Sequence, residues 1–193
     1  MSPNLKSVLT ALALAAILLT VSVRVIAPKL PPLVGRADVQ ETRNFAHANA
    51  NALRLASTDG MVIITPTSGS SITGNAVIRA FRRGDTTEDQ LREYVAGLVQ
   101  MREEQGTLVI QTEPGPRPAE YDLFVQYEIN VPEGTDLEVT SNNGNVWIRP
   151  GCGNVKVAGR NSDIDIAKPL GSVHAESVNG RIQLAEAPAG GTL

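Results

Sequence analysis

The chain has 193 residues, a formal net charge of −3, one cysteine, and only three Phe, three Tyr and one Trp. This length suits one domain with an accessory segment. The lone Cys152 excludes an intramolecular disulfide framework and a multi-cysteine zinc site. The scarcity of aromatic residues and of Lys/Arg runs argues against nucleic acid as a partner. We expect neither a cofactor nor a metal ion.

The first 27 residues predict a segment directed to a membrane. Residues 7–23 (SVLTALALAAILLTVSV) carry no charge, and this length is borderline for spanning a bilayer. A cleavable signal peptide is the competing interpretation. Because Pro28 follows the small-residue site Val25-x-Ala27, we favour an uncleaved signal anchor or transmembrane helix over residues 1–27. Prolines 28, 31 and 32 then predict a stiff linker over residues 28–36.

Residues 37–193 are predicted to form one β domain. The stretch LRLASTDGMVII, residues 53–64, places two leucines before Asp59-Gly60 and two aliphatic residues nine positions after them. Alternation of apolar side chains around an Asp-Gly pair is typical of a strand, a turn and a second strand. The repeated part of the domain is therefore expected to begin near residue 45.

A helical insertion is predicted over residues 87–105. Thr87 with Gln90 forms a capping-box pattern, and Gly106 marks the expected end of the helix. An apolar stripe follows helical spacing at Leu91, Tyr94, Val95, Leu98 and Met101. Residues 76–82, 107–112 and 121–131 read as strands. We expect the helix to cover an open edge or face of the sheet rather than to bind a partner.

The sequence from Leu137 onward repeats every nine residues. The first and third positions of nearly every block are aliphatic, and the eighth is a small turn residue. The corner asparagines Asn143, Asn161 and Asn179 are 18 residues apart, so one coil contains two blocks. These features predict an all-β fold class: a single-domain β-solenoid with ~18-residue coils and one inserted α-helix.

The run YEINVPEGTDLEVTSNNGNVWI, residues 127–148, resembles the bacterial putative-adhesin domain of unknown function. The stretches at 53–64 and 173–184 repeat its strand–turn–Gly–strand unit, so the resemblance covers roughly residues 45–193. It implies an envelope-associated, β-helical, adhesin-like domain that is often carried on a signal or anchor segment. The family has no established catalytic residues, so the resemblance transfers none.

The period assigns two outward rows that form the predicted interaction surface. One row is Glu138, Lys156 and His174, and the other is Trp147, Asp165 and Gln183. Trp147 is the strongest single candidate for a contact, because aromatic residues dominate binding hot spots. We therefore predict a non-catalytic, membrane-anchored module with a structural or adhesive role, whose partner is an envelope protein or glycan.

Two alternatives remain open. Asp163 and Asp165 lie two residues apart on one strand, which overlaps the carboxylate separations of glycosidases and permits a polysaccharide-acting enzyme. However, Arg181 is expected to form an ion pair with Asp163, and neither His47 nor His174 belongs to a triad motif. The other alternative is a self-assembling envelope scaffold that associates through an open C-terminal coil.

The predicted location is the bacterial cell membrane, with a single crossing and the β domain outside the cytoplasm. This orientation follows from the resemblance. The positive-inside rule points the other way, because Lys6 precedes the apolar segment whereas Arg24, Lys29 and Arg36 follow it.

Overall fold

The computed structural model describes residues 37–48, 50–113 and 121–186, all within one compact unit, Ala37–Leu193. Extended chain dominates this unit, with one helix among the described residues. The elements are β1 (Val39–Ala48), β2 (Ala52–Thr67), β3 (Ser71–Arg82), α2 (Glu88–Leu98), β4 (Val99–Glu104), β5 (Thr107–Thr112), β6 (Tyr121–Pro132), β7 (Asp136–Ile148), β8 (Val155–Ala167), β9 (Val173–Ser177) and β10 (Ile182–Ala185).

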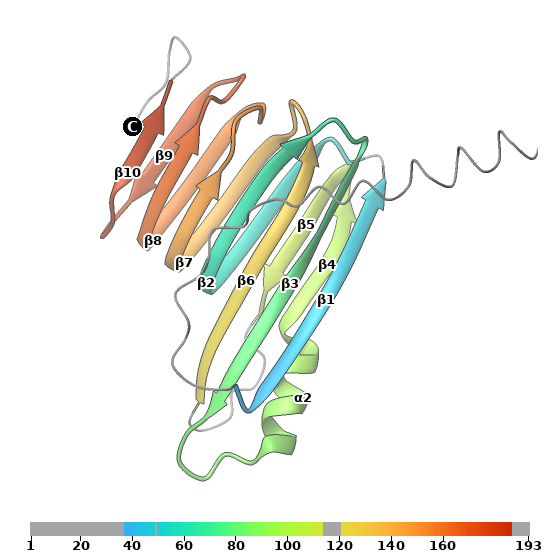
Figure 1. Cartoon of the computed structure of the whole chain (residues 1–193), viewed down its shortest axis with the longest axis vertical. Helices are drawn as coiled ribbons and strands as arrows, with labels where there is room; N and C mark the ends of the chain where they lie inside the picture. Colours follow the sequence, from blue (N-terminus) through green and yellow to red (C-terminus); the bar gives the residue numbers. More distant parts are fainter. Residues whose placement is uncertain (1–36, 49, 114–120, 187–193) are drawn as a thin grey trace, which may run out of the picture. The chain divides into compact units, whose positions relative to one another are not determined.

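The ten strands of the described chain belong to one mixed sheet. Its main order is β1-β3-β6-β2-β7-β8-β10, with β5 also on β2, β4 on β5 and β9 also on β8. The long strands use different neighbours along their length: residues 52–56 of β2 pair with β5, whereas residues 60–67 pair with β6. Because β2, β7 and β8 bend between their halves, the sheet folds over into two facing layers (Figure 1).

Glycine makes two of these bends possible. Gly60 and Gly144 have φ values of 141° and 136°, a region that side chains on L-residues rarely adopt. A Cβ atom on Gly60 would lie 1.9 Å from the carbonyl oxygen of Val125, and one on Gly144 would lie 1.5 Å from the carbonyl oxygen of Gly60. The backbones of successive strands therefore approach each other at the bend more closely than any other residue would allow.

A row of side-chain hydrogen bonds joins the bends. Asn143 Nδ2 donates to Asp59 Oδ1 at 2.7 Å, and Asn161 Nδ2 donates to Asn143 Oδ1 at 2.7 Å. Asn179 Nδ2 continues the row to Asn161 Oδ1 at 3.0 Å. The 18-residue spacing of the asparagines places equivalent side-chain amides on adjacent strands, so each amide donates a hydrogen bond to the preceding one.

The predicted β-solenoid is wrong as a description of the fold. The pairs β1–β3, β3–β6 and β4–β5 are antiparallel, so the sheet is mixed and its two layers are closer to a β-sandwich. Parallel neighbours 18 residues apart occur in the C-terminal part, where Leu137 pairs with Val155 and Val155 with Val173. The nine-residue period specifies these local neighbours. It carries no information about the antiparallel pairing of the preceding strands, which depends on contacts between distant residues.

The core lies between the two layers and includes Tyr127. This side chain is fully buried, and its hydroxyl lies 2.6 Å from Thr112 Oγ1. Burial raises the pKa of Tyr127 to about 12, although the Thr112 hydrogen bond acts in the opposite direction. The other large, fully buried side chains of the core are Leu53, Leu55, Ile64, Ile72, Ile78, Leu91, Leu98, Ile110, Ile129, Ile148 and Ile164.

Helix α2 begins as predicted and ends earlier than predicted. The capping box is present: Gln90 N donates to Thr87 Oγ1 at 3.3 Å, and Thr87 N donates to Gln90 Oε1 at 2.9 Å. The helix stops at Leu98 because residues 99–104 pair with β5 as strand β4. Gly106, with φ of 78°, therefore turns a hairpin instead of ending a helix, and Met101 belongs to a strand.

The C-terminal end of α2 is held by Arg43 of β1. Its guanidinium donates to the carbonyl oxygens of Val99 at 3.1 Å, Val95 at 3.3 Å and Ala96. A cation at this end complements the helix dipole and satisfies carbonyl groups that the helix leaves unpaired. The helix packs against β1, β3 and β4, so it covers the sheet margin, as expected from the sequence.

The segments predicted as a membrane anchor (residues 1–27) and as a linker (residues 28–36) lie outside the described residues. Among the described residues, no helix combines the length and the hydrophobicity needed to cross a bilayer, so the predicted transmembrane helix is not found there.

Candidate functional site

An open groove crosses the outer face of the layer formed by the first halves of β2, β7 and β8 together with β9. Its volume is about 550 Å³, and it is lined by three consecutive residues at or just before the start of each of these strands, together with Thr107 of β5. The buried residues Leu53, Leu137, Val155 and Val173 form the floor. One wall consists of Ala52, Asp136, Asn154 and Ser172, and the other of Arg54, Glu138, Lys156 and His174. The groove is therefore a straight channel perpendicular to the strands.

The second wall, here called the charged row, alternates in sign around Glu138. Arg54 Nε donates to Glu138 Oε2 at 2.8 Å, and Lys156 Nζ lies 3.0 Å from Glu138 Oε1. Strand pairing brings these residues together, because Arg54 and Lys156 are the register neighbours of Glu138 on β2 and β8. The Arg54 and Lys156 hydrogen bonds hold the pKa of Glu138 below its ordinary value, so this carboxylate stays charged.

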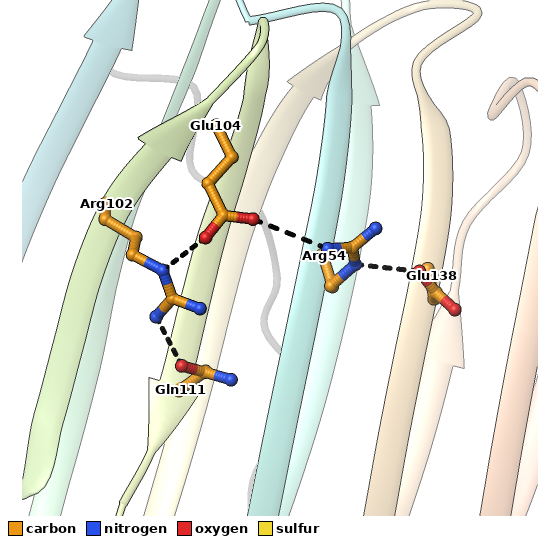
Figure 2. A network of polar contacts seen from close by, with 5 residues as sticks. All are labelled: Arg54, Arg102, Glu104, Gln111 and Glu138. Carbon is orange, nitrogen blue, oxygen red and sulfur yellow. Dashed lines mark hydrogen bonds and ion pairs between the residues drawn. The ribbon is translucent and has the colours of Figure 1, made fainter.

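Figure 2 shows how the charged row continues onto β4 and β5. Arg54 Nη1 lies 3.6 Å from Glu104 Oε2, and Arg102 Nε donates to Glu104 Oε1 at 2.6 Å. Arg102 also donates to Gln111 Oε1. The Arg102 hydrogen bond is the main cause of the lowered pKa of Glu104. The network fixes the side-chain positions along one wall even though each member is largely exposed.

The first wall is organised by a second set of hydrogen bonds. Asp136 Oδ1 accepts from the backbone N–H of Asn154 at 2.7 Å and from its Nδ2 at 3.1 Å. Asn154 Oδ1 accepts in turn from the N–H of Ser172 at 3.0 Å and from its hydroxyl at 2.9 Å. Since each side chain is held by the next strand, both walls are pre-organised before any ligand arrives.

The structure places the two predicted rows on different layers. Glu138, Lys156 and His174 are register neighbours, and the opposite-charge contact expected between Glu138 and Lys156 is observed. The row of Trp147, Asp165 and Gln183 is also in register, on the second halves of the strands. The first row borders the groove and the second does not.

Sequence reasoning missed half of the groove. Arg54, Asp136, Asn154 and Ser172 received no role, although the signal for Arg54 was present. The unit at residues 53–64 repeats the phase of residues 137–148, which puts Arg54 beside Glu138. The polar wall had no comparable signal, because its residues stand just before or at the starts of strands, where hydrophobic alternation does not reach.

One of the two carboxylates considered for catalysis, Asp163, takes part in the hydrogen bonding of the fold. Asp163 Oδ1 accepts a hydrogen bond from the backbone N–H of Arg181 at 2.8 Å. The expected ion pair is thus replaced by a backbone contact. His47 lies on β1, 3.0 Å from Glu103, far along the sheet order from His174 on β9. Within the described ranges, no group of three His, Cys, Asp or Glu side chains is arranged to hold a metal ion.

Cys152 is buried, and burial raises the pKa of its thiol to about 12. A thiol that stays protonated at neutral pH is a poor nucleophile. Cys152 fills a buried position in the turn between β7 and β8.

Comparison with known proteins gives structural similarity only. No protein-family model and no curated protein sequence matches the chain. The solved structures that resemble it include a putative cell adhesion protein from Clostridium sporogenes, with 9% identity and a TM-score of 0.42 over 76% of this chain and 99% of that one. A putative adhesin from Bacteroides fragilis has 12% identity and a TM-score of 0.34 over 77% and 94%.

A putative lipid binding protein from Parabacteroides distasonis has 17% identity and a TM-score of 0.32, over 75% of this chain and 59% of that chain. Two of these three structures carry adhesion names, as the resemblance seen in the sequence predicted. Similarity at these scores supports no inference about the function of this chain.

Proposed function

We propose that the protein is a non-catalytic binding module of the cell envelope, which recognises an acidic, linear glycan in the groove across β2, β7, β8 and β9. The observation that carries the proposal is the form of the groove, which is straight, open and walled by two pre-organised polar rows. Three gaps between adjacent strands give it a length of about 14 Å between the outer strands. An extended polymer fits such a channel better than a compact ligand does.

The charge of the ligand follows from the spare hydrogen-bonding capacity of the walls. Both oxygens of Glu138 already accept hydrogen bonds, one from Arg54 and one from Lys156. Lys156 and Arg54 retain further N–H donors, and the side chain of His174 forms no hydrogen bond or ion pair with another described residue. Since the unused hydrogen-bonding groups of the charged row are mainly donors, the ligand should supply acceptors. The carboxylates of an acidic sugar are acceptors that also carry a negative charge.

A binding role agrees with the surroundings of the groove. Both carboxylates of the groove already accept hydrogen bonds, Glu138 from Arg54 and Lys156 and Asp136 from Asn154, and the two hydrogen bonds to Glu138 hold its pKa below its ordinary value. The apolar residues 7–23, which direct the chain to a membrane, support a place in the envelope.

The test is a titration of the purified full-length chain with an acidic polysaccharide, polygalacturonate, and with neutral dextran. We expect binding of the acidic polymer alone, weakened by added salt. Lys156→Gln and His174→Gln should each lower the affinity by about threefold, as exposed charge contacts do. Arg149→Gln removes an exposed cation outside the groove and is the matched control. Equal losses in all three variants, or no binding of the acidic polymer, would refute the proposal.

A further inference from the structure

The sheet ends in two strands with an unused backbone edge. Within the described residues, β9 and β10 each pair with β8 alone. Val155 N donates to the carbonyl of Ser172 at 2.9 Å, and Val178 N donates to that of Gly159 at 3.1 Å. Even-numbered residues of β9 therefore face β8, because the direction of backbone groups alternates along a strand. The N–H and C=O groups of Val173, Ala175 and Ser177 point to the free edge.

The same reasoning applies to β10 in the other layer. Ile164 N donates to the carbonyl of Arg181 at 2.8 Å, and Lys168 N donates to that of Ala185 at 2.9 Å. Odd-numbered residues of β10 thus face β8, and Ile182 and Leu184 present their backbone groups outward. Among the described residues, both layers end at this side of the sheet with backbone donors and acceptors that have no partner, and such an edge is the usual template for another strand.

The opposite end of the sheet also has edge strands, β1 and β4, but it is partly protected. Helix α2 packs against β1, β3 and β4, and Arg43 fastens its C-terminal end. On β1, Glu41, Arg43 and His47 lie on the half-buried side of the strand. Charged or polar side chains that point inward discourage an edge strand from pairing with another chain. Because head-to-tail stacking of chains would need the protected end as well, a closed pair through the β9 and β10 edges is favoured.

Two large apolar side chains flank the free end. Leu170 is 67% exposed and Val178 is 76% exposed, and these are the exposed large hydrophobic residues of the described chain. Leu170 lies in the corner before β9 and Val178 in the corner after it. The turns before and after β9 therefore both present apolar surface beside the free backbone edge of that strand.

We propose that two copies of this chain pair edge to edge, β9 with β9 and β10 with β10, antiparallel about one two-fold axis. In β9 the axis passes Ala175, which sets Val173 opposite Ser177 of the second copy. All three free residues then form hydrogen-bonded pairs. His174 faces Glu176 of the second copy in a pair without backbone hydrogen bonds, where side chains lie closest.

One axis serves both layers. In β10 a centre at Gln183 sets Ile182 opposite Leu184 of the second copy, which matches the free backbone groups there. Ala175 and Gln183 are each four residues from Asn179, where the chain turns from one layer to the other, so the two centres lie at the same height. An arrangement that pairs β9 correctly thus pairs β10 correctly as well.

The corners also meet in this arrangement. Continuing the register from Ala175, Leu170 falls opposite Gly180 of the second copy, and Val178 falls opposite Ser172 of the second copy. The two exposed apolar side chains are thereby covered at both ends of the interface.

The test uses a cysteine at the proposed axis in the full-length chain, kept in mild detergent because of its apolar residues 7–23. Gln183 would face its own copy at a Cα separation of about 4.5 Å, which a disulfide can bridge. Gln183→Cys should therefore form a covalent dimer on mild oxidation. Asp165→Cys is the matched control: Asp165 is the register neighbour of Gln183 on β8, and two copies would stand about 14 Å apart.

A second variant weakens the interface between copies and keeps the hydrogen bonds within each copy. The N–H of Ala175 points to the free edge, so Ala175→Pro removes only bonds between copies. In sedimentation velocity it should weaken the dimer by about tenfold or more. If circular dichroism shows that the proline perturbs folding, Glu176→Lys provides a second test of the dimer. Glu176 is exposed and would face His174 of the second copy.

Three results would overturn the proposal. They are a Gln183→Cys chain that stays monomeric on oxidation, an Asp165→Cys chain that cross-links equally fast, and a dimer that survives both Ala175→Pro and Glu176→Lys. Dimerisation that begins only after deletion of residues 187–193 would assign the edge to the chain's own tail and would also overturn it.

Discussion

The buried Tyr127 makes the stability of this protein depend on alkaline pH in a predictable way. Its pKa rises from 10.0 to about 12 on folding, mainly because burial disfavours the phenolate. A group whose pKa is raised in the folded state contributes stability that is complete below the unfolded pKa and is lost as pH rises through the folded value. A shift of about two pKa units corresponds to ~2.7 kcal/mol, lost between pH 10 and 12.

Tyr127→Phe removes this titration and leaves the ring in place. At pH 7 we expect a loss of about 1 kcal/mol, because Thr112 loses its hydroxyl partner. Between pH 10 and 11 the difference in stability between wild type and variant should shrink and then change sign, since only the wild type has the Tyr127 phenol to ionise. Urea unfolding followed by circular dichroism at intervals from pH 7 to 11 measures both curves.

Tyr121→Phe is the matched control. The Tyr121 hydroxyl donates to the Tyr94 hydroxyl at 2.9 Å, but the side chain is only partly buried. Its removal should lower stability by a similar amount without flattening the alkaline limb. Wild-type and Tyr127→Phe curves that stay parallel up to pH 11 would refute the assignment of the alkaline dependence to this residue.

Two further substitutions, each with a control substitution, test the fold. Gly144→Ala should destabilise the folded protein by roughly 3 kcal/mol or more, because the added Cβ would lie 1.5 Å from a backbone carbonyl oxygen. Gly97→Ala on α2 is the control: its Cβ would meet nothing within 4 Å, so it should stabilise the protein by about 0.5–1 kcal/mol. Equal effects of the two substitutions in thermal melts would contradict the bend geometry. Arg43→Ala should lower the stability by about 2 kcal/mol, because the carbonyl groups at the end of α2 lose their hydrogen-bond donor. Arg92→Gln is the control: it breaks only the exposed ion pair with Glu88 and should lower the stability by less than about 0.5 kcal/mol in the same melts.

The candidate groove was partly predictable from the sequence. Outward rows follow from the nine-residue period, so the neighbours Glu138, Lys156 and His174 were identified correctly. The other half needed the pairing of β2 with β7, across 84 residues, which delivers Arg54 to Glu138. A period reports spacing within one stretch of chain. It does not report which distant stretch lies beside it.

The helix gives the same lesson on a smaller scale. Its start was predictable because the Thr87–Gln90 capping box is a local interaction. Its end was not, because Met101 continues the apolar spacing and yet lies in β4. Pairing with β5 outweighs the local helical pattern there, since strand pairing satisfies the backbone groups of a whole segment at once.

By itself the sequence determined the local properties of this protein: alternating strands, corners at Asn-Gly and Asp-Gly, and 18-residue neighbours from Leu137 onward. These depend on steric rules and side-chain periods that act over a few residues. Only the tertiary structure decided that the strands form one mixed sheet folded into two layers, with a groove on one face and two free edges at one end. Those features depend on burial and backbone pairing between residues far apart in the chain, and no local pattern encodes that choice.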